Sequence, residues 1–273
     1  MNAPRQSRPP VVAGRFYPSR SEDLREVVTA YTSSFSPETA QPALAAVVPH
    51  AGYVYSGATA GETLARIRVP QSVLLLGPNH TGLGYGCALS PDDWAVPGAT
   101  IPRDEALCAA ILRRCSFARE DREAHSREHS LEVELPFLHT LRPDMRIACL
   151  CLGGLTLAQC RELAEGLHAA LMELARPVLI VASTDMNHYE SRAVGERKNR
   201  AAVDRILALD AAGLFETVRR ERITMCGVLP VCVTIFLTQA LGASQVELVR
   251  LTDSGEASGD TDQVVGYAGL VIA

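Results

Sequence analysis

Short, almost continuous apolar runs alternate along the chain with longer stretches in which apolar residues recur every three or four positions. Runs of the first kind, rich in valine, leucine and isoleucine, are typical of parallel strands that are buried on both faces. Stretches of the second kind predict amphipathic helices. The predicted strands cover residues 43–48, 72–76, 146–152, 178–182, 246–251 and 264–272.

Helices are predicted before and between these strands. Asp104 and Thr156 each stand directly before a helical pattern, and both residue types are favoured N-caps. Pro136 falls inside another helical pattern and predicts a kink there. The predicted helices cover residues 24–33, 57–67, 104–115, 130–141, 157–175, 197–209, 211–219 and 231–241.

This alternation predicts an α/β fold with a mostly parallel central sheet and helices on both of its faces. No linker rich in serine, glycine or proline divides the chain, and no internal repeat is visible, so we expect one domain spanning residues 1–273. The segment ALSPDDWAVPGATIPRD, residues 88–104, is rich in turn-forming residues and is expected to be a loop.

Composition narrows the classes of function. The chain has a formal net charge of -5, no basic block and only 5% aromatic residues, so it lacks the features of a nucleic-acid-binding protein. No segment approaches the roughly 20 apolar residues of a membrane span, and the N-terminus does not resemble a secretory signal. We therefore expect a cytoplasmic protein without nucleic-acid or membrane partners, whose 8 cysteines remain free thiols.

Polar side chains follow three of the predicted strands. His50 follows the first strand, His80 follows the second, and Asp185 and His188 follow residues 178–182. A single histidine after a strand is usually a hydrogen-bonded loop residue. The carboxyl ends of parallel strands meet at one edge of a sheet, however, so three such clusters predict a shared crevice. Imidazoles beside a carboxylate are typical ligands of iron, copper or zinc.

Cys226, in the segment ITMCGVLP, lies just before a predicted helix. A helix N-terminus and a bound metal would both favour its thiolate form. An inert buried thiol, such as the one expected for Cys232, explains the residue equally well.

A second cluster, HSREHSLEVELPFL, places His125, Glu128 and His129 in the H-x-x-E-H pattern of inverted zinc peptidases. The surrounding sequence disfavours that interpretation, because Ser130 is the predicted N-cap and the helix would start after the motif. His129 is then expected to be a loop residue that points into the crevice.

Six motifs occur in order along almost the whole chain, from AGRFYPS near Gly14 to the C-terminus: VVPHAGYVYSG, LLLGPNHTGLG, EHSLEVELPFL, VASTDMNHYE, TMCGVLP and SGEASGD with VVGYAG. Together they resemble the Memo family, including the bacterial and archaeal members named as component B of the AmmeMemoRadiSam system. That family is similar in fold to the class III extradiol dioxygenases, non-haem iron enzymes that open catechol rings.

The resemblance implies His50, His80 and Cys226 as metal ligands, with Asp185 and His188 close by. Dioxygenases of this fold use two histidines and a carboxylate. A thiolate in place of the carboxylate would soften the site and admit Cu(I) or Fe(II). Ring cleavage is therefore not implied, although the architecture is shared.

Two functions are compatible with this pattern. The first is an iron- or copper-dependent oxidoreductase, in which Asp185 orients a ligand or carries a proton, His188 or His129 is a general acid or base, and Tyr53 lines the crevice. The second is a non-catalytic metal-binding protein or scaffold that partners AMMECR-like and radical SAM proteins. Its crevice would receive a small molecule or a peptide, as the family's eukaryotic adaptors imply.

Overall fold

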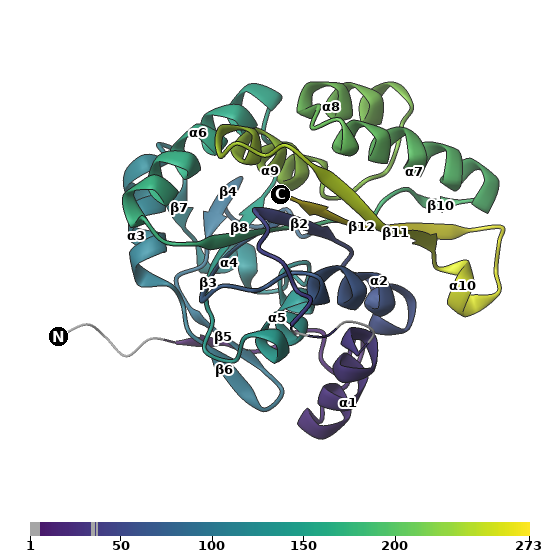
Figure 1. Ribbon diagram of the computed structural model, residues 1–273, viewed down its shortest axis with the longest axis horizontal. Coiled ribbons are helices and arrows are strands. Elements are labelled where there is room, and N and C mark those ends of the chain that lie inside the picture. The colour runs from purple at the N-terminus through teal and green to yellow at the C-terminus, as the bar shows by residue number, and fades with distance from the viewer. Residues whose placement is uncertain (1–5, 34–35, 37) are drawn as a thin grey trace.

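The computed structural model describes residues 6–33, 36 and 38–273. A large sheet runs through the molecule between two groups of helices (Figure 1). Within the described residues it has nine strands in the order β10-β12-β2-β9-β3-β8-β4-β7, with β11 paired to β12. These strands are β2 (Ala45–Val48), β3 (Ser72–Pro78), β4 (Cys87–Leu89), β7 (Arg119–Glu120), β8 (Arg146–Leu152), β9 (Val178–Ser183), β10 (His188–Glu190), β11 (Val246–Asp253) and β12 (Val264–Ile272).

The centre of this sheet is parallel. Strands β2, β9, β3 and β8 run in the same direction, whereas β12 pairs antiparallel with β2 and β4 pairs antiparallel with β8. Every residue of β3 is buried, which explains why its sequence is apolar without alternation. The predicted α/β class with a mostly parallel central sheet is confirmed, and the sheet becomes mixed towards its edges.

Two separate cores lie on the two faces of the sheet. On β3, Leu74 and Leu76 face one core, while Val73 and Leu75 face the other, because successive strand side chains point to opposite sides. Helices α3, α6, α7, α8 and α9 contribute to the core on the first face and α1, α2 and α5 to that on the second (Figure 1). The helices are α1 (Ser21–Thr32), α2 (Tyr53–Ala65), α3 (Glu105–Arg114), α4 (Arg122–His125), the 3-10 helix η1 (Glu132–Glu134), α5 (Leu135–Leu141), α6 (Leu157–Leu174), α7 (Arg192–Leu207), α8 (Ala211–Arg220), α9 (Val228–Ala240) and α10 (Gly255–Ser258).

The start signals predicted for two helices are present. Thr156 and Gln159 form a capping box at α6, and the carboxylate of Asp104 accepts the backbone N–H of Leu107 at α3. The kink predicted at Pro136 is wrong. Helix α5 is shorter than predicted and Pro136 lies in its first turn, where a missing N–H breaks no helical hydrogen bond.

The loop predicted over residues 88–104 is also wrong in part. This segment contains the end of β4 and two further strands, β5 (Asp93–Val96) and β6 (Ala99–Ile101), which form a hairpin around Gly98 at φ +87°. With β1 (Ser7–Arg8) they make a second, three-stranded sheet. Strands of three or four residues are too short to show a periodic pattern, and turn residues dominate the composition around them.

Two findings bear on the expectations from composition. All eight cysteines are free thiols, and Cys226 alone among them is not fully buried. The helices in the described part of the chain are each too short or too polar to span a membrane.

The imidazole of His125 supplies a pH-dependent contribution to stability. It is buried beside Trp94, with Nε2 3.0 Å from the carbonyl oxygen of Ala88. Burial lowers its pKa from 6.5 to about 4. Between these two values the unfolded chain binds a proton that the folded chain does not, so stability falls as the pH falls. We expect a loss of about 2 kcal/mol through this residue between pH 7 and pH 5.

Urea unfolding of the wild type and of His125→Gln at pH 7 and pH 5 measures this loss. Glutamine can still donate a hydrogen bond towards Ala88 but does not titrate. The free energy of unfolding of the wild type should fall by about 2 kcal/mol more than that of the variant. Equal losses in both proteins would contradict the assignment.

Candidate metal centre

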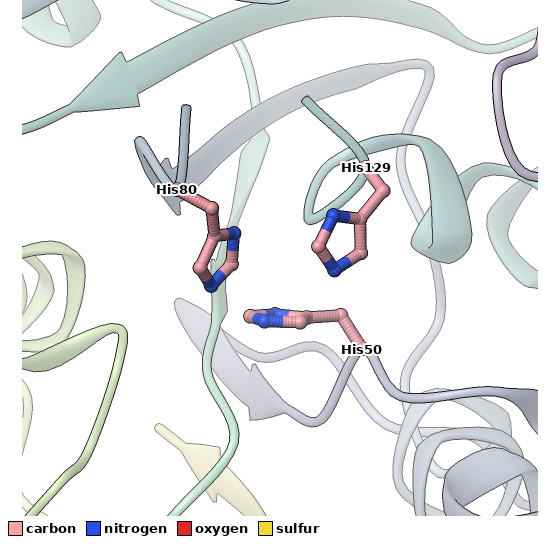
Figure 2. A group of neighbouring side chains, drawn as sticks. All are labelled: His50, His80 and His129. Carbon is pink, nitrogen blue, oxygen red and sulfur yellow. The ribbon is translucent and has the colours of Figure 1, made fainter. Parts of the chain in front are cut away.

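Three histidines from separate segments meet at the carboxyl edge of the parallel strands. His50 follows β2, His80 follows β3, and His129 precedes η1. One ligand nitrogen from each ring lies within 4.8 Å of those of the other two. The centroids of the His80 and His129 rings are 4.8 Å apart, and the His50 ring stands edge-on to both, so the three rings surround a common point (Figure 2).

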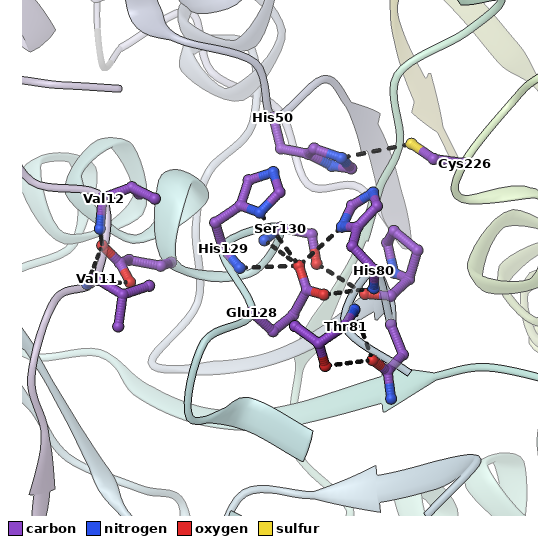
Figure 3. A network of polar contacts seen from close by, with 12 residues as sticks. Val11, Val12, His50, His80, Thr81, Glu128, His129, Ser130 and Cys226 are labelled. Atoms are coloured by element: carbon purple, nitrogen blue, oxygen red, sulfur yellow. Dashed lines mark hydrogen bonds and ion pairs between the residues drawn. The ribbon is translucent and has the colours of Figure 1, made fainter. Parts of the chain in front are cut away.

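A buried carboxylate, Glu128, orients two of these histidines. Its Oε1 lies 2.9 Å from Nδ1 of His80, and its Oε2 accepts the backbone N–H of His80 at 2.6 Å. The backbone N–H groups of His129 and Ser130 also donate to Oε1, each at 2.8 Å (Figure 3). A metal-binding histidine is commonly held in this way by a carboxylate on its other nitrogen.

These contacts and burial shift the pKa values of Glu128, His80 and His129. Burial alone would raise the pKa of Glu128, but the hydrogen bond and charge of His80, together with backbone N–H groups, lower it to about 2. Burial would lower the pKa of His80, but the hydrogen bond and charge of Glu128 and the charge of Asp185 raise it overall. For His129, burial dominates and lowers the pKa.

Hydrogen bonds hold both the backbone and the ring of His50. Its backbone N–H donates to Oδ1 of Asp185 at 2.9 Å, and its Nδ1 lies 2.7 Å from Oγ of Ser183. Burial, followed by the neighbouring His80 and His129, holds its pKa well below the usual value. His50 is therefore neutral, and its Nε2 lies 3.4 Å from Sγ of Cys226.

Cys226 lies beside His50 but outside the group that the three histidines form. The backbone N–H of Asp185 donates to its sulfur at 3.2 Å. Burial, and then the charge of Asp185, raises the pKa of the thiol to about 12. Its place just before α9 therefore does not make it a thiolate without a metal.

The other predicted site residues are Asp185, His188 and Tyr53. Burial raises the pKa of Asp185 to about 7 against the backbone hydrogen bond from His50. His188 begins β10, and its charge would bear on both His50 and His80. The ring of Tyr53 is buried, and its hydroxyl donates to the carbonyl oxygen of Val133 at 2.7 Å.

The H-x-x-E-H segment does not form a peptidase site. Helix α4 ends at His125, whose ring binds the carbonyl of Ala88, whereas His129 joins His50 and His80. The two histidines of the pattern therefore do not face one metal. Glu128 orients His80 and is a functional candidate that sequence reasoning missed. The sequence offered Glu128 only as part of the H-x-x-E-H pattern, and its position next to His129 was the available signal.

The N-terminal segment braces the loop that carries His129. Arg8 pairs with the buried Glu132 at 2.7 Å and also donates to the carbonyls of His125 and Glu128. Glu132 further accepts the hydroxyl of Tyr17 at 2.7 Å and two backbone N–H groups. This ion pair is nearly dry, with 5% exposure on Arg8 and none on Glu132.

Removing one partner of this pair should be costly. We expect Arg8→Met to lower the free energy of unfolding by about 3–5 kcal/mol, because the charge of Glu132 is left buried and unpaired. Arg20→Met is the matched control, since Arg20 and Glu22 are 73% and 79% exposed, and it should cost less than about 1 kcal/mol. Urea unfolding at pH 7 measures both, and similar small losses would refute the bracing role of Arg8.

Known proteins match this chain over nearly its whole length. The family model described as Memo-like protein matches residues 8–271. The chain is 40% identical to MEMO1 family protein MK0963 of Methanopyrus kandleri, over 97% of this chain and 98% of that protein. It is 38% identical to a MEMO1 family protein of Archaeoglobus fulgidus, again over 97% and 98%.

A solved structure supports the fold alone. An uncharacterized protein of Escherichia coli K12, JW3007, superimposes with a TM-score of 0.52 at 14% identity, over 82% of this chain and 98% of that one. The match of the family model to nearly the whole chain, together with relatives at 40% and 38% identity, shows that this chain belongs to the Memo-like protein family.

Proposed function

We propose that the chain is a metal-dependent oxidoreductase that binds iron or copper through His50 and His80. The convergence of the three imidazoles carries the proposal. The third ligand comes from one of two side chains next to His50. His129 completes the histidine group, and Cys226 is the residue that the family resemblance implies.

The donor set fits a divalent metal or Cu(I). A ligating imidazole must be neutral, and burial lowers the pKa of both His50 and His129. Glu128 raises the pKa of His80, so a metal at that ring would compete with a proton. Glu128 and Ser183 occupy Nδ1 of His80 and His50, which leaves Nε2 of each ring for a metal. Imidazole nitrogen suits iron, copper and zinc alike, so the choice of iron or copper is part of the proposal.

The position of Cys226 is also compatible with a shared ion. A nitrogen and a sulfur bound tetrahedrally to one metal lie roughly 3.6 Å apart. Sγ of Cys226 is 3.4 Å from Nε2 of His50. Because the free thiol is protonated, binding through Cys226 would release a proton, and metal affinity would rise with pH.

The bound iron or copper would supply redox chemistry and Lewis acidity. Asp185 and His188 stand beside the expected ligands and would exchange protons with a substrate there. The substrate would enter past the exposed part of His80, whose side chain is 33% accessible.

Partner binding at the same place is a second candidate. Tyr189 is 72% exposed next to His188, and it adopts φ 58°, an uncommon conformation for a residue other than glycine. An exposed ring held in this way at the site supports contact with a peptide or a partner surface. The expected AMMECR-like and radical SAM partners stay predictions.

Metal content after anaerobic purification without a nickel column tests the principal proposal. The wild type should contain about one equivalent of iron or copper. His50→Ala and His80→Ala should each lower the occupancy severalfold, because each removes a ligand, and elemental analysis with a circular dichroism check of folding measures this. His168→Ala on α6 is the control and should retain the metal.

Two further variants identify the third ligand. Loss of metal in Cys226→Ser but not in His129→Ala would assign the thiolate, and the reverse would assign the histidine. A wild type without metal, or full occupancy in both His50→Ala and His80→Ala, would overturn the proposed site. Oxygen uptake by the loaded protein with catechols then tests for turnover.

A further inference from the structure

Glu134 is a buried carboxyl group without a counter-charge among the described residues. It is fully buried at the end of η1, and its Oε2 has no hydrogen-bond partner there. Its Oε1 lies 2.8 Å from Oγ of Ser183. The two neighbouring glutamates differ, because Glu132 pairs with Arg8 and Glu128 with His80 and backbone N–H groups.

The hydroxyl of Ser183 is in contact with three groups but has one proton to give. Oγ lies 2.7 Å from the carbonyl oxygen of Ser130, 2.8 Å from Oε1 of Glu134 and 2.7 Å from Nδ1 of His50. A carbonyl oxygen can only accept, so the Ser183 proton goes to Ser130. The other two contacts then need protons from His50 and Glu134, and the two lone pairs of Oγ accept both.

We propose that Glu134 is a protonated, neutral carboxylic acid that donates to Ser183, and that this arrangement fixes His50 as the Nδ1–H tautomer with a free lone pair on Nε2. Glu134 is thus a positioning residue that acts on His50 through Ser183. Its link to metal binding rests on the proposed function, whereas its protonation and the tautomer of His50 do not.

The surroundings of Glu134 also favour its protonated form. Burial, reinforced by the charge of Asp185, raises the pKa of Glu134 well above its usual value despite the hydrogen bond to Ser183. An ionised carboxylate here would be an unpaired buried charge, which costs far more than one unpaired carbonyl oxygen. Nε2 of His50, the nitrogen left with the lone pair, is the one that faces Cys226.

Infrared difference spectroscopy of the metal-free chain in D2O tests the protonation directly. At pH 7 the spectrum of the wild type minus that of Glu134→Gln should show the C=O stretching band of a carboxylic acid. Glu165→Gln, at an exposed position on α6, is the control and should instead show the loss of a carboxylate band. A carboxylate band lost in Glu134→Gln would overturn the proposal.

The tautomer can be measured without changing Glu134. Long-range proton–nitrogen NMR spectra of the metal-free wild type, assigned with His50→Ala, should show the proton of His50 on Nδ1. A proton on Nε2 would overturn the proposal even if Glu134 variants fail to fold. Both measurements are made without metal, so their failure is distinguishable from failure of the proposed metal site.

Rescue by a conservative variant separates positioning from packing. Glutamine can donate its amide N–H to Ser183, whereas leucine fills similar space without a donor. With Co(II) as the probe and its visible absorption as the readout, Glu134→Gln should bind within threefold of the wild type. Glu134→Leu should bind roughly 10–100-fold more weakly, as is usual when a partner of a ligand is lost. Equal affinities of the two variants would refute the positioning role.

Discussion

The buried carboxylate of Glu128 is the interaction on which the site depends. It binds the backbone and ring of His80, which follow β3, and the backbone of His129 and Ser130, which lie in a different part of the chain. Two histidines from segments about fifty residues apart are thereby held around one acid. Without that carboxylate, the backbone N–H groups of His80, His129 and Ser130 would lose their acceptor.

The short segment from Glu128 to Glu134 carries three buried acids, each in a different electrostatic environment. Glu128 is a carboxylate held by hydrogen bonds, and its pKa is about 2. Glu132 forms a buried ion pair with Arg8 of the N-terminal segment. Glu134 contacts Ser183 but has no counter-charge among the described residues, and burial holds its pKa well above the usual range. One stretch of sequence thus joins the N-terminal segment, the histidine group and the strand end at Ser183.

The register of the sheet brings the site residues close together. Its parallel strands β2, β3 and β9 end at one edge, with Val48 in register with Ser183 and Leu76 with Ala182. His50, His80 and Asp185 leave these strands at similar heights, so short loops suffice to bring them together. The helices on the two faces bury the strands in two apolar cores.

The sequence by itself determined six strands of the large sheet, most helices and the strand ends that carry His50, His80 and Asp185. Those features are local, because apolar periodicity, capping residues and turn chemistry act over a few positions. The hairpin at Gly98, the place of Pro136 and the separation of His125 from His129 were decided by tertiary packing. So were the pairing of Arg8 with Glu132 and the states of the three glutamates. These depend on burial and on partners as distant as 124 positions, and no local pattern encodes which charges will meet once water is excluded.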